Sequence, residues 1–318
     1  MSKVTVVIPN YNHERYLAKR IDSVLAQNYK NFDIIILDDK STDHSIQVIE
    51  QYRKLPNVEI LYNETNSGSP FVQWNKGVIH AQTEYIWIAE SDDYNHPDFL
   101  GTLVEVLEKD KAVALAYCKS YKVDKDDNVL AEWEEWVREE STERWSSDFI
   151  ADGNAEILRH IRYGLTIPNA SSVVFRKDCY INCGLAPTDM RIAGDWMTWT
   201  KLLHNNKLAF VSQHLNFFRT HTENVRSKTY SNGLRFEEEV RVILFATRLL
   251  NISGKEKRSI LSELCKKYAN MIISLNTFFP LPRASKLFTS LVKEDPMALL
   301  YISGYFVTRP FKSISRRI

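Results

Sequence analysis

The sequence predicts an α/β fold in which a mostly parallel sheet carries helices on both faces, followed by a helical C-terminal addition. Three observations predict it. Short apolar runs alternate with amphipathic stretches up to about residue 118. The apolar runs end abruptly in polar residues, as strands do, and from about residue 233 only helical periodicity continues. Strands and helices that alternate at this spacing form right-handed βαβ units.

The expected elements follow in a regular order. Short apolar runs predict strands over residues 4–9, 32–39, 58–63 and 84–93. Apolar residues at helical spacing predict helices over 16–27, 45–54 and 70–81. Residues 119–160 are polar and are expected to be irregular. A strand over 171–178, a helix over 194–205 and a pair of extended segments over 207–221 should follow, and then helices over 234–251 and 257–275.

Composition bounds the class of protein. The chain of 318 residues is 44% hydrophobic and 25% charged, so it can bury a sizeable core. It has 41 Lys and Arg against 40 Asp and Glu, a balance that argues neither for nor against any partner. The spacing of its four cysteines fits neither a zinc site nor a disulfide framework, which predicts free thiols.

The hydropathy pattern predicts a cytoplasmic protein. The N-terminus enters a strand pattern at once, so we expect no signal peptide. The longest nearly apolar run, residues 297–307, is too short to cross a bilayer. Aromatic and basic residues are mixed over 300–317, which fits peripheral contact at the inner face of the membrane, dimerisation through the C-terminal helices, or an end that packs on itself.

Polar residues follow each of the first four predicted strands. The stretches "PNYN", "DDKSTD", "NETNSG" and "ESDD" stand at their carboxyl ends. The carboxyl ends of parallel strands meet at one edge of a sheet, where the connecting loops open a crevice for ligands. The sequence therefore predicts a binding site at this edge.

These motifs carry a resemblance to a known family. "VVIPNYN", "IIILDDKSTD", "NSG…NKG", "ESDD" and "GDW" resemble, in order and spacing, glycosyltransferase family 2, whose GT-A fold is Rossmann-like and binds nucleotide sugars. The resemblance covers residues 1 to about 225. We therefore expect a GT-A domain over residues 1–228 and a helical add-on domain over 229–318.

The "ESDD" stretch predicts a metal site. Three carboxylates within four residues repel one another unless positive charge lies among them, and a hard divalent cation that binds a diphosphate would supply it. The resemblance implies that Asp92 holds the ribose hydroxyls or the metal and that Asp93 holds the metal, Mn²⁺ or Mg²⁺. Glu90 stands where the family pattern has Asp. The segment containing His221 resembles one that closes the site in relatives, which makes His221 a further candidate metal ligand. An acidic turn in solvent or an Mg²⁺ site of another enzyme class is the alternative.

The ends of the first two strands are expected to hold the nucleotide base. By resemblance, Pro9, Tyr11 and Asp39 line this pocket: the Tyr11 ring can stack on uracil, and the Asp39 carboxylate can accept a hydrogen bond from uracil N3–H, which cytosine lacks. Asp38 is expected to be structural. Because "DDKSTD" is rich in helix-capping residue types, capping is the alternative for these acids, and we assign it to Asp43.

The loop before the third helix is expected to hold the nucleotide diphosphate. Asn66 and Gly68 are the nucleotide-binding candidates, since Gly68 permits close approach of the backbone and a helix N-terminus favours anions. Many relatives carry Arg where this chain has Trp74. Asn75 and Gly77, the rest of that motif, can equally serve to pack the helix on the sheet.

Asp195 in "GDW" is the candidate catalytic base. Transfer with inversion needs a group that removes the proton from the acceptor hydroxyl as the hydroxyl attacks, and the family places an acid at the start of a helix for this role. The alternative for Asp195 is helix capping. Trp196 and Trp199 can form a sugar platform, but their helical spacing is typical of core residues.

The motifs together predict an inverting, UDP-sugar-dependent hexosyltransferase. It would transfer galactose, glucose or N-acetylhexosamine to a glycan acceptor on a glycoprotein or a lipid-linked polysaccharide precursor. We therefore expect a sugar-nucleotide donor and a glycan acceptor, and no nucleic-acid partner. One alternative is a metal-dependent nucleotidyltransferase, which would need a glycine-rich phosphate loop with Lys that "PNYNHERY" does not provide. Another is a noncatalytic glycan-binding or assembly module.

Overall fold

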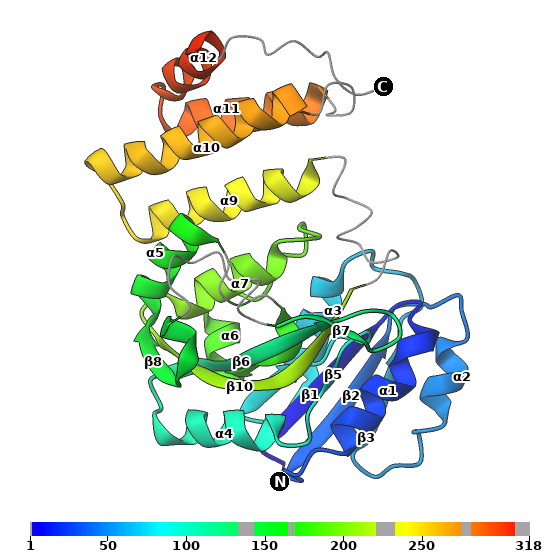
Figure 1. The fold of residues 1–318 in the computed structure, drawn as a ribbon. Coiled ribbons are helices and arrows are strands. Elements are labelled where there is room, and N and C mark those ends of the chain that lie inside the picture. The colour runs from blue at the N-terminus through cyan, green and yellow to red at the C-terminus, as the bar shows by residue number, and fades with distance from the viewer. Residues whose placement is uncertain are drawn as a thin grey trace. The chain divides into compact units, whose positions relative to one another are not determined.

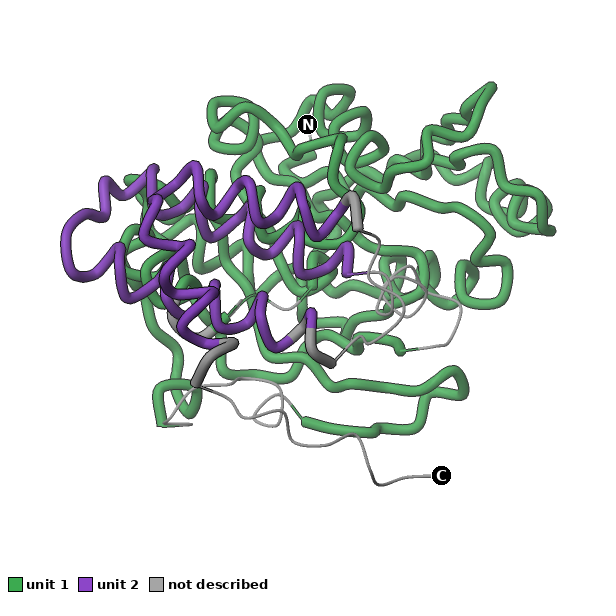
Figure 2. Tube along the Cα trace, turned by 90° about the horizontal axis from the view of Figure 1, so that it is seen from above, with its two compact units in different colours: residues 1–224 green, residues 225–318 purple. Residues whose placement is uncertain are grey.

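The computed structural model describes residues 2–132, 143–164, 167, 169–220, 233–274 and 281–308. The chain divides into two compact units, residues 1–224 and 225–318 (Figure 2). The boundary expected near residue 228 lies outside the described residues.

One sheet forms the centre of the first unit. Within the described part of the chain its strands run in the order β3-β2-β1-β4-β9-β6-β10-β5, with β7 on β6 and β8 on β10. The strands are β1 (Val4–Asn10), β2 (Phe32–Asp38), β3 (Val58–Tyr62), β4 (Tyr85–Ile88), β5 (Tyr94–Asn95), β6 (Val113–Val123), β7 (Val129–Ala131), β8 (Phe149–Asp152), β9 (Val173–Arg176) and β10 (Lys207–Arg219).

The first four strands are parallel and in close register. Asn10 of β1 pairs with Asp38 of β2, and Asp38 pairs in turn with Tyr62 of β3. β9 then runs antiparallel between β4 and β6, while β6 and β10 are again parallel to each other. The predicted α/β class with a mostly parallel sheet is confirmed.

Helices cover both faces of this sheet (Figure 1). Apolar residues of α1 (Glu14–Leu25), α2 (Ser45–Glu50) and α4 (Phe99–Lys109) join Val4, Val6 and Ile8 of β1 in one buried core. Val7 points to the opposite face, since side chains alternate along a strand. There α3 (Pro70–His80) approaches so closely that a Cβ at Gly77 would lie 2.4 Å from Val7 Cγ1. Gly77 therefore packs its helix on the sheet. The remaining helices of eight or more residues in this unit are α5 (Gly153–Tyr163) and α7 (Gly194–Leu203) among the described residues.

Two expectations for the middle of the chain are wrong. The described residues of the range 119–160, namely 119–132 and 143–160, are not irregular throughout, because they contain the end of β6, the short strands β7 and β8, and the start of α5. The pair of extended segments over 207–221 is the single strand β10, paired with β6 along its length. Its register shifts between Val211 and Asn216, and such bulges bend a strand without ending it.

The second unit is helical in its described residues. It comprises α9 (Leu234–Leu249), α10 (Gly254–Ser274), α11 (Leu281–Glu294) and α12 (Ala298–Thr308). α10 contacts α11 and α12, and Glu237 of α9 pairs with Arg283 and Lys286 of α11 at 2.8 and 2.7 Å. None of the helices described in the chain combines the length and the apolar character that crossing a membrane requires. The four cysteines are free thiols, as predicted.

Candidate active site

The carboxyl ends of β1, β2 and β3 bring three polar motifs together. Asp39 N donates to Asn10 O (2.9 Å), and Asn63 N donates to Asp38 O (2.9 Å). The segments that follow β1, β2 and β3 therefore leave the sheet side by side. Tyr11, Asp39 and the loop of residues 63–69 consequently share one edge of the sheet, as the strand pattern predicted.

Asp39 is the centre of a hydrogen-bond network at this edge. The residue is 4% exposed. Oδ1 accepts from Asn63 Nδ2 (2.6 Å), Ser67 N (2.9 Å) and Gln73 Nε2 (2.9 Å), whereas Oδ2 accepts from Ser67 Oγ (2.7 Å). Its main-chain carbonyl accepts from Asn66 Nδ2 (2.9 Å). Asp39 therefore orders the loop after β3, and Oδ2 is the less occupied of its two oxygens in the described structure.

The other residues expected in the base pocket differ in exposure. Tyr11 is 46% exposed just beyond β1, so its ring is accessible, whereas Pro9 is buried within β1. Asp38 is also buried and binds Asn10 Nδ2 (2.8 Å) and Ser41 Oγ (2.6 Å), as expected of a structural acid. Asp43 accepts from Glu14 N and Ser45 N, the first residues of α1 and α2, but it does so from the position before His44, which is the N-cap residue of α2.

The loop of residues 66–69 leads directly into α3. Gly68 has φ +71°, in the left-handed region that glycine adopts without strain, and its N–H donates to Asn66 Oδ1 (2.7 Å). Asn75 holds the segment before α7, because its side chain bonds both Ala186 O (2.9 Å) and Ala186 N (3.0 Å). For Asn75, as for Gly77, the packing interpretation is the one that the contacts support.

The three acids after β4 lie in distinct surroundings. Glu90 Oε1 accepts from Trp74 Nε1 on α3 (2.7 Å). Asp93 is buried and its Oδ1 accepts from Arg219 N (2.8 Å), whereas Asp92 is partly exposed. Burial, with the adjacent charge of Asp92, raises the pKa of Glu90 to about 8 and that of Asp93 to about 7. Placing these acids together is therefore electrostatically costly.

Two buried arginines lie against this turn, and the sequence did not single them out. Arg20 Nε donates to Glu90 O (2.8 Å), and Arg219 Nε donates to Asp92 O (2.8 Å). Burial lowers the pKa of Arg20 to about 10, while the neighbouring acids oppose the shift. A signal for Arg20 was present: it lies three residues after Leu17 and four before Val24, on the apolar face of α1.

The acids fit the divalent cation that the family resemblance implies. Carboxylate oxygens are the donors that Mn²⁺ and Mg²⁺ accept, and a dication would relieve the repulsion that raises the pKa values of Glu90 and Asp93. Of the two expected ligands, Asp92 is the more exposed. Within the described ranges, no group of three or more His, Cys, Asp or Glu side chains is arranged to hold a metal ion. His221, the third expected ligand, lies outside them.

Asp195 begins α7, and α7 packs on α3. A Cβ at Gly194 would lie 2.3 Å from Phe71 Cε2, so this helix start abuts the first turn of α3. Asp195 is partly exposed, and its Oδ1 accepts from Trp196 N (2.7 Å). α3 therefore contacts both segments: its Phe71 lies against the start of α7, and its Trp74 donates to Glu90 in the acid turn, residues 90–93. The candidate base Asp195 is connected to the acid turn in this way.

The two tryptophans of α7 are core residues. Trp196 and Trp199 are buried, and the Trp199 ring lies 6.0 Å from that of Trp74. The core interpretation of their spacing is therefore confirmed, and the sugar-platform interpretation is wrong.

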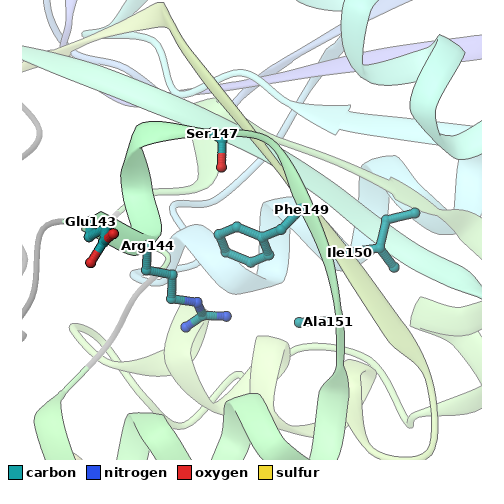
Figure 3. A pocket seen from close by; sticks show the side chains of 6 residues that line it. All are labelled: Glu143, Arg144, Ser147, Phe149, Ile150 and Ala151. Atoms are coloured by element: carbon teal, nitrogen blue, oxygen red, sulfur yellow. The ribbon is translucent and has the colours of Figure 1, made fainter.

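A separate surface hollow lies beside β8 (Figure 3). It measures about 490 Å³ and is lined by Glu143, Arg144, Ser147, Phe149, Ile150 and Ala151. β8 pairs with residues 207–210 of β10, whereas β5, which follows the acid turn, pairs with residues 216 and 217. The hollow and the candidate active site therefore lie at different ends of β10.

Comparisons with known proteins agree with this architecture. The model of the family described as glycosyl transferase family 2 matches residues 5–164. Over 102 residues the chain is 34% identical to the poly(ribitol-phosphate) beta-N-acetylglucosaminyltransferase TarS of Staphylococcus aureus, a match that covers 31% of this chain and 18% of that protein. The chain thus matches less than a fifth of that relative's length.

Two solved structures share the fold. The crystal structure of S. aureus TarS 1–349 in complex with UDP-GlcNAc matches with a TM-score of 0.72 at 19% identity, over 95% of this chain and 89% of that one. The mannosyltransferase PcManGT from Pyrobaculum calidifontis, in complex with GDP-Man and Mn²⁺, matches with a TM-score of 0.53 at 16% identity, over 96% and 85% of the two chains. At these identities the likeness establishes the GT-A fold alone.

Proposed function

We propose that this chain, which belongs to glycosyl transferase family 2, transfers a hexose from a UDP-sugar to a hydroxyl group of a glycan acceptor, with inversion at the anomeric carbon. The observation that carries the proposal is the convergence of Tyr11, Asp39 and the acids after β4 at one edge of the sheet. A structural neighbour that binds UDP-GlcNAc supports the choice of donor class.

Asp39 would select the base. Its Oδ2 accepts from Ser67 Oγ and has a lone pair left for the N3–H of uracil, while the exposed ring of Tyr11 would stack on the base. Asn66 and Gly68 would let the main chain of the loop approach the diphosphate closely at the start of α3. Cytosine presents no donor at N3, so it would leave the Asp39 carboxylate without this bond.

Asp92 and Asp93, with His221, would hold the divalent cation, and Asp92 would also reach the ribose. When bound, the cation neutralises the diphosphate and stabilises the departing nucleotide. Asp195 would act on the opposite side of the sugar. The acceptor oxygen forms its bond to the anomeric carbon as the bond from that carbon to the diphosphate oxygen breaks, and the acceptor proton passes to Asp195.

The acceptor would be a glycan on a glycoprotein or on a lipid-linked polysaccharide precursor, with galactose, glucose or N-acetylhexosamine as the transferred sugar. We favour the lipid-linked precursor because Met297, Leu299 and Leu300, at the start of α12, are 41%, 47% and 61% exposed. Residues 309–317 add Arg309, Lys312, Arg316 and Arg317 without an acid. Apolar and basic residues in this combination suit peripheral contact with the anionic inner face of a membrane.

The donor proposal is tested by incubating the purified protein with a panel of UDP-sugars and GDP-mannose in Mn²⁺ and measuring nucleotide release. Release of UDP from one UDP-hexose, stimulated by a glycan acceptor, is expected. A noncatalytic binding module would release no nucleotide from any donor, and preferential release of GDP would remove the assignment of Asp39 to uracil.

Membrane contact is tested by co-sedimentation with vesicles of anionic or neutral lipids. Binding should require anionic lipid and should weaken in Leu300→Asp. Dimerisation through the same residues would instead change the sedimentation coefficient with protein concentration and would not depend on lipid.

A further inference from the structure

We propose that Arg20 and Arg219 are positioning residues that hold the acid turn, residues 90–93, in the geometry that binds the cation and the donor. This inference rests on the proposed function. The guanidinium groups of the two arginines bond main-chain carbonyls of the turn, and the turn carries the carboxylates proposed to bind the cation.

Arg219 ties the turn to a neighbouring hairpin. Its guanidinium donates to Asp92 O (Nε, 2.8 Å), Asp124 O (Nη1, 2.7 Å) and Asp127 Oδ1 (Nη2, 2.5 Å), and its main-chain N–H donates to Asp93 Oδ1 (2.8 Å). Asp124 and Asp127 lie in the turn between β6 and β7. Arg219 thus fixes the main chain at Asp92 through its side chain, and it fixes the carboxylate of Asp93 through its main-chain N–H.

Packing restricts the Arg219 guanidinium further. It lies over the rings of Tyr16 and Tyr94, at 4.7 and 5.5 Å from their centroids. Tyr94 in turn stacks on Phe217 at 4.5 Å with an interplanar angle of 6°. Lys19 binds the second oxygen of Asp127 at 2.6 Å. Tyr94 and Asp127, which contact Arg219, are therefore held in place by contacts of their own.

Arg20 holds the other end of the turn. Its Nε donates to Glu90 O (2.8 Å) and its Nη1 to Asn95 Oδ1 (2.6 Å), while the guanidinium lies 5.6 Å from the centroid of Trp87. Ser171 accepts from both segments: its main-chain oxygen accepts from Asn95 Nδ2 (3.1 Å), and its hydroxyl accepts from Glu90 N (3.1 Å). Arg20 of α1 thus holds the carbonyl of Glu90, and Arg219 of β10 holds the carbonyl of Asp92, two residues later.

Two consequences follow from this arrangement. Each guanidinium brings a positive group against the turn, which opposes the repulsion among its carboxylates before a cation arrives. They also fix where the carboxylates point, and partners that orient metal ligands usually change metal affinity by roughly 10–100-fold when they are replaced. Lys retains the charge but cannot reproduce the directed donations of the planar guanidinium, two from Arg20 and three from Arg219, so Arg→Lys separates positioning from charge.

Arg176 provides a matched control. It is similarly buried, and it donates from Nε to Val113 O (3.0 Å), from Nη2 to Leu107 O (2.6 Å) and from Nη1 to Glu84 Oε1 (2.8 Å). It pairs with Tyr85 at the start of β4, whereas the acid turn follows the end of that strand. Arg176→Lys should therefore lower stability without disturbing the turn.

The experiment measures Mn²⁺ binding in the presence of UDP, from the electron paramagnetic resonance signal of free Mn²⁺, for wild-type protein, Arg20→Lys, Arg219→Lys and Arg176→Lys. We expect Arg20→Lys and Arg219→Lys to bind Mn²⁺ roughly 10–100-fold more weakly than wild type. Arg176→Lys should bind it as wild type does. Circular dichroism and thermal unfolding confirm that each variant is folded at the assay temperature.

Affinity in Arg219→Lys that equals wild type, or that falls no further than in Arg176→Lys, overturns the proposal. If Arg219→Lys does not fold, Asp127→Asn loosens Arg219 from a partly exposed position and should lower Mn²⁺ affinity in the same direction, and an unchanged affinity there also overturns it. Wild-type protein that binds neither Mn²⁺ nor UDP would instead contradict the proposed function itself.

Discussion

Replacing Asp39 with Asn should weaken UDP binding and also destabilise the fold. The Asp39 carboxylate accepts bonds from Asn63, Ser67 and Gln73, three of them at Oδ1. A hydrogen bond to a charged acceptor stabilises by about 1 kcal/mol more than a neutral one, so these three bonds lose about 3 kcal/mol. The lower cost of burying a neutral amide offsets part of this loss. The free energy of unfolding should fall by about 1–3 kcal/mol, and UDP affinity should fall by about tenfold or more, because the amide NH2 that replaces Oδ2 cannot accept from N3–H.

Two measurements separate these effects. Denaturant unfolding gives the change in stability, and calorimetry with UDP and CDP in Mn²⁺ gives the change in affinity and base preference. Asp38→Asn is the control, because Asp38 is similarly buried and accepts from Asn10 and Ser41 but is assigned no nucleotide contact. Both variants should be destabilised, and only Asp39→Asn should lose the preference for UDP over CDP. An unchanged preference in Asp39→Asn, or an equal loss of UDP affinity in the two variants, would refute the reasoning.

Three further outcomes are expected. Burial raises the pKa of Asp93 to about 7, so below that pH Mn²⁺ must displace a proton from the carboxyl to bind. Mn²⁺ affinity should therefore fall as the pH is lowered from 8 to 6, and chelation of the metal should abolish transfer. An affinity that calorimetric titrations find independent of pH, or full activity in excess chelator, would contradict this prediction. Asp195→Asn should keep the UDP affinity of the wild type but lower kcat by roughly 10²–10⁴-fold. In the wild-type reaction an α-linked donor should give a β-linked product, as identified by NMR. Weakened UDP binding in the variant, or an α-linked product, would remove the role of catalytic base from Asp195. Burial lowers the pKa of His160 from 6.5 to about 4, so the neutral imidazole stabilises the fold above pH 6.5, and this contribution is lost as the pH falls from 6.5 to 4. In His160→Phe the free energy of unfolding should therefore depend less on pH across that range. A pH dependence equal to that of the wild type would exclude the effect.

The first half of the fold was predictable because its signals are local. β1, β2 and β4 are buried on both faces, so they appear in sequence as short apolar runs that end at polar residues. β7 and β8 have no such signal. They contain three and four residues, respectively. β7 is a strand because it pairs back onto β6 in a hairpin, and β8 is a strand because β10, distant in sequence, offers it a pairing partner. Tertiary context of this kind is absent from local periodicity.

The candidate site was predictable to the same extent. Polar residues after parallel strands must meet at one sheet edge, so the approach of Tyr11 to Asp39 followed from the strand pattern alone. The partners of each acid did not follow from it. Asp39, expected to face a ligand, also orders its own loop through Asn63 and Ser67. Which helix residue faces the acid turn depends on the packing of α1 against the sheet, and Arg20 was therefore recognisable as an unusual residue on an apolar face but not as a partner of Glu90.

Two departures from the family pattern are explained by a single contact. Trp74 stands where many relatives carry Arg, and Glu90 stands where the pattern has Asp; separately, each weakens the resemblance. In the structure Trp74 Nε1 donates to Glu90 Oε1 at 2.7 Å, so the two departures meet. An indole brings a hydrogen-bond donor without the charge of a guanidinium, and the pKa of Glu90, raised to about 8 by burial and by Asp92, favours a neutral carboxyl near pH 7. The uncharged indole donor on α3 therefore suits a carboxyl whose pKa is raised above 7. Within the turn, burial and the charge of Asp92 raise the pKa of both Glu90 and Asp93, and the charge of Arg20 acts against that shift in both acids.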